Sequence, residues 1–230
     1  MTLTELRAKG REQACGNILI LFLIGLIWEA VISVLITPAI IFYTIGIVFS
    51  MNWATGEFDN IGLFVATVVV FMIVVYVVAI LINGLVLYGN VVNNNRMFKG
   101  EKATFGAAFE GLKRKKISLK TFTLMFLYII LWGMIPFVGI ILMIIKEYAY
   151  SCAFYIMQED NNINGNAAIT KSRQLMNGYK MKMFLLDLSY IGWYILVLLT
   201  CGILGIWVGP WHNQARYNLY QQIKTAQVKA

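Results

Sequence analysis

Residues 167–223 read AAITKSRQLMNGYKMKMFLLDLSYIGWYILVLLTCGILGIWVGPWHNQARYNLYQQI, and this stretch decides the fold. It begins with a short polar helix and continues with an apolar run from Met181 to Leu199. It then turns at Thr200–Gly202 and ends in a second run that becomes polar after Pro210. An apolar run of about 18 or more residues can cross a bilayer as a helix. The stretch therefore predicts a hairpin of two membrane-spanning helices behind a short polar helix.

The composition of the whole chain is typical of a membrane protein. Of the 230 residues, 60% are hydrophobic and 13% are charged, whereas soluble domains carry about 25% charged residues. The formal net charge of +8 raises the question of nucleic-acid binding. The basic residues are nevertheless segregated by loop and do not gather in one patch studded with aromatic residues. We therefore expect membrane lipids as partners, and no nucleic acid.

The layout of polar helix, span, outer turn and span occurs three times along the chain. The expected fold class is therefore an all-α membrane protein with six transmembrane helices, arranged as three pseudo-repeated helical hairpins. A short amphipathic or polar cytoplasmic helix precedes each hairpin, and the first of these, in residues 1–17, is either an interfacial helix or a solvated tail. A single polytopic domain over residues 1–230 would comprise hairpins at about 18–92, 117–158 and 181–220 and cytoplasmic connectors at 93–116 and 159–180.

The helix boundaries of the first hairpin depend on Pro38 and on a run of asparagines. One helix over Ile18–Ser50 would be about 50 Å long, which exceeds the roughly 30 Å of the hydrocarbon core. Pro38 either kinks a single span or breaks the run near Thr37. At the other end of the hairpin, Asn93–Asn95 are expected to terminate the second helix.

Lys and Arg are distributed unequally between the two sides of the predicted bundle. The turns at 51–60, 135–136 and 200–202 contain none of the 19 Lys and Arg residues. Because basic residues are retained in cytoplasmic loops, we predict that both termini are cytoplasmic. The basic run Lys113–Lys116 borders the third span. It is interpreted as an anchor facing anionic lipid, in preference to a patch that binds phosphate or nucleic acid.

Ionisable residues within the predicted spans are candidates for a functional site. Lys146 lies well inside the fourth span, and a charge at the bilayer centre costs at least about 2.5 kcal/mol, so Lys146 needs a partner. Asp187 is the first candidate and Glu29 the second, which makes these three residues the candidates for a structural ion pair. The alternatives left open are a group that lines a polar cavity and a proton relay.

The inner halves of the fourth and sixth spans are rich in polar and aromatic residues. Tyr150 belongs to the fourth span, and His212 and Arg216 belong to the sixth. These helix ends either protrude into the cytoplasm behind a Trp/Tyr belt or line a polar vestibule that opens to the cytoplasm. The candidates for ligand binding or for lining a cavity are therefore Lys146, Asp187, Tyr150, His212 and Arg216.

The sequence contains no enzyme signature. A single histidine cannot form a multi-histidine metal site, and no G-x-S-x-G, H-E-x-x-H or P-loop sequence occurs. Cys15, Cys152 and Cys201 form no C-x-x-C pair and are interpreted as small hydrophobic residues. We therefore expect no catalytic residue, no metal and no cofactor.

Three blocks of sequence resemble a known family. Residues 172–180, SRQLMNGYK, and residues 184–193, FLLDLSYIGW, are similar to the C-terminal signature of a family of Gram-positive integral membrane proteins, domain of unknown function 975. Residues 146–151, KEYAYS, fit the central block of that family. The resemblance covers most of residues 96–223. It implies a multi-pass protein of the bacterial plasma membrane, and it implies no activity.

Two hypotheses about function remain open at this point. The first is a non-enzymatic membrane protein that binds or moves a small amphiphile, lipid or peptide through a polar cavity open to the cytoplasm. The second is a non-catalytic structural or accessory subunit that contacts other membrane proteins. Repeats of this kind occur in transporters, where they place shared sites between repeats, and they also occur in membrane proteins that transport nothing.

Overall fold

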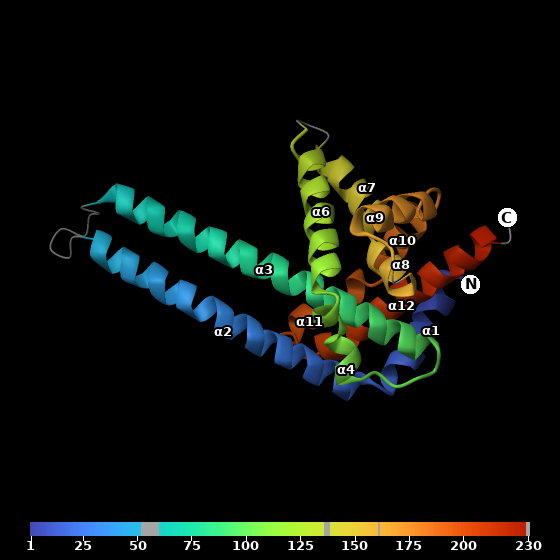
Figure 1. Ribbon diagram of the computed structural model, residues 1–230. Helices are drawn as coiled ribbons and strands as arrows, with labels where there is room; N and C mark the ends of the chain where they lie inside the picture. The colour runs from blue at the N-terminus through green and yellow to red at the C-terminus, as the bar shows by residue number, and fades with distance from the viewer. Residues whose placement is uncertain (52–59, 136–138, 161, 229–230) are drawn as a thin grey trace. The chain divides into compact units, whose positions relative to one another are not determined.

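The computed structural model describes residues 1–51, 60–135, 139–160 and 162–228, which fold into helices (Figure 1). They form two compact units, one of Met1–Ile24 with Gly84–Ala230 and the other of Gly25–Asn83. The helices are α1 (Leu3–Cys15), α2 (Ile18–Ser50), α3 (Ile61–Phe98), α4 (Phe105–Ala108), α5 (Glu110–Lys113), α6 (Lys115–Gly133), α7 (Gly139–Tyr150), α8 (Ala153–Glu159), α9 (Gly165–Leu175), α10 (Lys180–Leu188), α11 (Ile191–Leu199) and α12 (Gly205–Val228).

Five helical segments of the described chain are long and apolar enough to cross a membrane. They are Ile18–Ser50, Ile61–Phe98, Lys115–Gly133, Gly139–Glu159 and Lys180–Leu199. The sixth predicted span, residues 203–220, lies mostly in α12, which begins at Gly205, and it is not one of the five, because polar residues follow Pro210. The described residues are therefore helical, and their five candidate spans are consistent with a membrane protein.

The smaller unit contains most of α2 and the first part of α3. Helix α2 continues through Pro38, so the alternative in which the chain breaks at this proline is wrong. The two helices of the unit approach closely where Gly46 lies against Thr67, and the rings of Tyr43 and Phe71 stack with centroids 4.8 Å apart. Most other large apolar side chains of this unit are exposed, which suits a surface covered by lipid tails.

The predicted end of α3 at its run of asparagines is wrong, because the helix continues to Phe98. Two of these side chains accept tertiary hydrogen bonds. The backbone N–H of Thr104 donates to Asn93 Oδ1 at 3.0 Å, and the hydroxyl of Tyr217 donates to Asn95 Oδ1 at 2.9 Å. Tertiary contacts therefore outweigh the weak helix propensity of asparagine.

The first and last helices of the chain, α1 and α12, lie side by side in the larger unit (Figure 1). Leu6, Gly10 and Ala14 form the buried face of α1. Gly10 is so close to α12 that a Cβ atom on it would lie 2.8 Å from the backbone nitrogen of Ala215. The N-terminal segment is therefore a packed helix and not a solvated tail.

The third hairpin folds back on itself at Cys201–Gly202, where φ is 50° and 89°. The hydroxyl of Tyr190 donates to the carbonyl oxygen of Trp211 at 3.3 Å, and Lys182 Nζ donates to Gln222 Oε1 at 3.4 Å. In each pair, one residue precedes the turn by about as many positions as the other follows it. The predicted turn is confirmed, and α12 runs antiparallel to α10 and α11.

Ser172 on α9 bridges the break between α7 and α8. Its hydroxyl accepts the backbone N–H of Cys152 at 3.1 Å and donates to the carbonyl oxygen of Ala149 at 2.9 Å. The side chain is fully buried. It supplies partners for two backbone groups that cannot reach water, and such groups are almost always paired in folded proteins.

Ser172→Ala is expected to lower the free energy of unfolding by about 1–3 kcal/mol, because two buried backbone groups lose their partner. Thermal unfolding of the detergent-solubilised protein measures this loss. Thr170→Ala is the matched control on the exposed side of α9, and we expect it to change stability by less than about 0.5 kcal/mol. Equal stability of the two variants would show that Ser172 does not support the break.

Candidate functional site

Asp187 on α10 faces two basic side chains of α12. Its Oδ1 atom lies 2.7 Å from His212 Nε2 and 3.5 Å from Arg216 Nε. The basic residues are four positions apart, so they share one face of α12. The three side chains are between 12% and 27% exposed. The third hairpin therefore brings together three of the predicted site residues, which we call the Asp187 cluster.

His212 connects the Asp187 carboxylate to a tyrosine on α11. Its Nδ1 atom is 2.7 Å from the hydroxyl oxygen of Tyr194. In a neutral imidazole, Nε2–H donates to the carboxylate while Nδ1 accepts the hydroxyl proton of Tyr194. The ring of Tyr190 also stacks on the imidazole, with centroids 4.6 Å apart. Both ring nitrogens are thus occupied, and the orientation of the ring is fixed.

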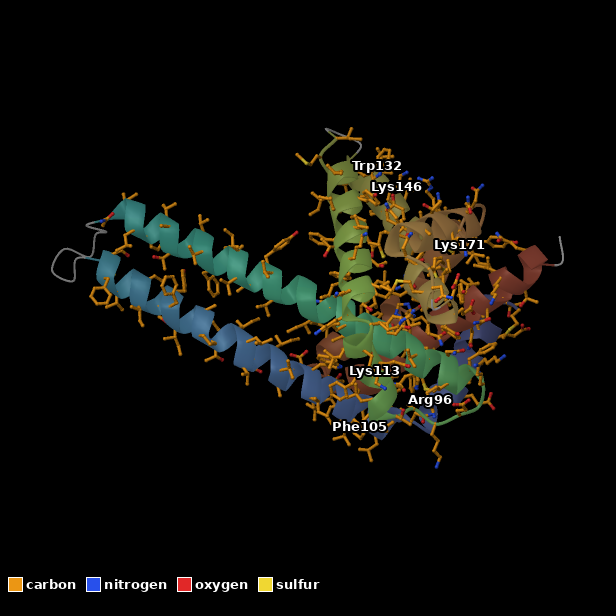
Figure 2. The ribbon with its side chains drawn as sticks, viewed as in Figure 1. Arg96, Phe105, Lys113, Trp132, Lys146 and Lys171 are labelled. Carbon is orange, nitrogen blue, oxygen red and sulfur yellow. The ribbon has the colours of Figure 1, made fainter. Side chains whose placement is uncertain are left out.

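Lys146 does not form the expected ion pair with Asp187. Its Nζ atom lies 4.0 Å from the ring centroid of Trp132 (Figure 2). The hairpin of α6 and α7 places Lys146 beside this aromatic face, and a cation above an indole ring is stabilised by the ring quadrupole. Asp187 is neutralised instead by the α12 residues, so the prediction of a Lys146–Asp187 pair is wrong.

No ion pair or hydrogen bond among the described residues of the larger unit links Tyr150 to the Asp187 cluster. Tyr150 is 3% exposed, and its ring centroid lies 6.2 Å from that of Tyr128, so it is part of the core. Glu29 is exposed and belongs to the smaller unit. Its pairing with Lys146 stays a prediction.

Arg216 also lines a hollow of about 170 Å³ within the larger unit, which we call the polar hollow. Its apolar lining residues are Leu87, Val91, Met125, Phe154 and Tyr155. Its polar lining residues are Asn90, Asn94, Glu147, Ser151, Asn213 and Arg216. The lining therefore combines amide, hydroxyl and charged groups with a wall of hydrocarbon and aromatic surface.

The guanidinium of Arg216 retains unused hydrogen-bond donors. Its Nε atom is buried and has no hydrogen-bond partner among the described residues. The 3.5 Å separation from Asp187 is an ion pair, but it is too long for a strong hydrogen bond. Nε is the atom that faces Asp187, and the two terminal amino groups donate no hydrogen bond among the described residues. Because these groups carry four of the five N–H donors of a guanidinium, Arg216 can bind an acceptor in the polar hollow.

Sequence reasoning missed several residues of this region. Tyr194 follows Asp187 by seven positions, a spacing that would place both on one face of the single span predicted from Met181 to Leu199, so this spacing could have identified it. Asn90 and Asn94 share a face of α3 by the same rule. Their position opposite Asn213 depends on how α3 packs against α12, and no local pattern in the sequence indicates this packing.

Comparison with known protein families gives one result. A family model described as "Protein of unknown function (DUF975)" matches residues 112–227, which is half of the chain. The matched region contains the whole Asp187 cluster and helices α6 to α11. Comparisons with curated proteins and with solved structures find no match. The resemblance identified in the sequence is thus confirmed, and the chain belongs to the DUF975 family of unknown function.

Proposed function

We propose that this protein is a non-enzymatic membrane protein that binds or moves a small amphiphile, lipid or peptide through the polar hollow. One observation carries the proposal, namely that Arg216 lines the hollow and its two terminal amino groups donate no hydrogen bond among the described residues. Small-molecule sites combine apolar walls with a few converging polar groups. The lining of the hollow has this mixed character, which suits a ligand with a polar head and an apolar remainder.

The proposal includes a topology of six spans in three pseudo-repeated hairpins. Helix α12 contains 24 residues, about 36 Å at helical rise, and it runs antiparallel to α10 and α11. If those helices cross the bilayer, α12 is long enough to return across it. Its buried polar residues Gln214 and Asn218 are tolerated because they face protein and not lipid. With the basic connectors inside, both termini and the mouth of the hollow face the cytoplasm of a bacterial cell.

Native mass spectrometry of the detergent-purified protein tests the binding step. The wild-type protein is expected to retain a small amphiphile. Arg216→Gln is expected to lower this retention by about tenfold or more, because a charge-assisted hydrogen bond is lost. Arg173→Gln, which changes an exposed arginine on α9, is the matched control and should retain the amphiphile as the wild type does.

A second variant separates ligand binding from folding. Arg216→Gln also removes the ion pair with Asp187, whereas Asn213→Leu changes an exposed residue of the lining. We expect Asn213→Leu to weaken retention and to leave the apparent Tm unchanged. A folded wild-type protein that retains no amphiphile would overturn the proposal and favour the alternative, a structural or accessory subunit that contacts other membrane proteins.

A further inference from the structure

Glu147 and Arg216 are the charged residues that line the polar hollow, and they have opposite signs. They form no ion pair with each other in the described part of the chain. Arg216 is shared with Asp187, and Glu147 has no ion-pair partner among the described residues. The hollow therefore presents a cation and a carboxylate that do not neutralise each other directly.

We infer that the polar hollow binds a zwitterionic head group, with an anionic oxygen group on Arg216 and an ammonium group on Glu147. This inference rests on the proposed function and names its ligand class. A guanidinium binds carboxylate or phosphate oxygens through several N–H donors. An ammonium group presents three donors, and a carboxylate accepts them. A head group that carries both charges satisfies both residues at once.

The neutral lining residues fit the same class of ligand. Asn90 and Asn213 supply amide groups that can both donate and accept hydrogen bonds, and Ser151, whose hydroxyl donates to the carbonyl oxygen of Tyr148, can still accept one. They can therefore bind the polar atoms that connect the two charges. Leu87 and Met125 line the hollow as well, and they provide an apolar surface for the first carbon atoms of a lipid tail.

The size of the hollow limits what can be enclosed. Its volume of about 170 Å³ is smaller than the roughly 300–1,000 Å³ of pockets that enclose a drug-sized ligand. A head group with an anionic oxygen group and one amine fits such a space, while an acyl chain must remain outside it. A free small zwitterion and the head group of a lipid share this chemistry, so an experiment must distinguish the two sources.

Opposite charges in the lining also give selectivity. A purely anionic head group leaves Glu147 without a partner and places like charges near each other. A purely cationic head group leaves Arg216 without a ligand partner and places a second positive charge near it. Because specificity is a difference between affinities, the carboxylate discriminates against anionic lipids, and the guanidinium discriminates against cationic amphiphiles.

The test compares head groups on the full-length protein in detergent by native mass spectrometry. Phosphatidylethanolamine, phosphatidylglycerol and free phosphoethanolamine are added separately to wild type, Glu147→Gln and Glu12→Gln. We expect wild type to bind phosphatidylethanolamine about tenfold more tightly than phosphatidylglycerol. Glu147→Gln should remove this preference, and Glu12→Gln, which changes an exposed carboxylate on α1, should keep it.

Binding of free phosphoethanolamine to wild type would identify a soluble zwitterion as sufficient, and binding of the lipid alone would identify the membrane as the source.

The outcomes distinguish this inference from the proposed function. If wild type retains both lipids equally and Glu147→Gln changes nothing, the zwitterionic ligand is ruled out while amphiphile binding stands. If wild type retains no amphiphile and no free zwitterion, both the inference and the proposed function fail. Since Glu147 is exposed and forms no ion pair in the described structure, its replacement by glutamine should leave the apparent Tm unchanged. A lower Tm of this variant would therefore reveal a folding defect, separately from any change in lipid binding.

Discussion

Asp187→Ala is expected to lower the free energy of unfolding by about 3 kcal/mol, because it leaves Arg216 without its counter-ion and His212 without its acceptor. For a chain of this size the loss corresponds to an apparent Tm lower by about 6–12 °C. The measurement is thermal unfolding of the detergent-solubilised protein, followed by tryptophan fluorescence. Asp187→Asn should lose less, since its amide oxygen can still accept the proton of His212 Nε2.

The matched control for this prediction is an ion pair at the surface. Asp160 lies 3.6 Å from Lys171, and both side chains are about half exposed, at 46% and 56%. Exposed pairs contribute roughly 0–1 kcal/mol, so Asp160→Ala should shift the apparent Tm by less than about 4 °C. If Asp187→Ala is no more destabilising than this control, the Asp187 cluster does not hold the third hairpin together.

The second large effect is expected from Gly10→Leu at the contact between α1 and α12. A Cβ atom at this position would lie 2.8 Å from the backbone nitrogen of Ala215 and 2.9 Å from the carbonyl oxygen of Trp211. Backbone atoms of a helix cannot move aside as a flexible side chain can, so the helices must separate. We expect a loss of about 3 kcal/mol, at the upper end for overpacked positions.

Hydrogen exchange locates this effect on α1. The amides of α1 should exchange much faster in Gly10→Leu, because the helix loses its packing partner. Gly16→Ala is the control, since Gly16 has no atom within 4 Å of an added Cβ. Unchanged protection of α1 in Gly10→Leu would mean that the close contact with α12 does not hold the helix.

The sequence predicted the helical class and most helix positions because apolar runs of this length form helices in lipid. Its errors occurred where tertiary contacts override local signals. The end of α3 was misplaced because Asn93 binds Thr104 in the connector after the helix and Asn95 binds Tyr217 on the distant α12. The break between α7 and α8 was missed because it depends on Ser172, which approaches from α9. The residues next to the end of α3, or next to the break between α7 and α8, do not identify these partners.

The candidate site was predicted in part for a related reason. His212 and Arg216 were found because they are ionisable residues within a predicted span. The partner of Lys146 was misassigned because a charge was expected to require an opposite charge, whereas the face of Trp132 also stabilises a cation. A polar vestibule between the fourth and sixth spans was one of two alternatives, whereas the part of the lining that comes from α3 and α6 could not be predicted, since the packing of these helices has no local signal.

The pairing of α1 with α12 has a consequence for biosynthesis. Gly10 and Ala215 are separated by about 200 residues, and ribosomes add about 5–20 residues per second. The N-terminal helix therefore waits on the order of 10–40 s for its partner to emerge. During this interval Leu6 and Ala14 must be shielded by the membrane surface or by a chaperone. The synthesis of α12, and not the insertion of the first hairpin, is the step at which the larger unit closes.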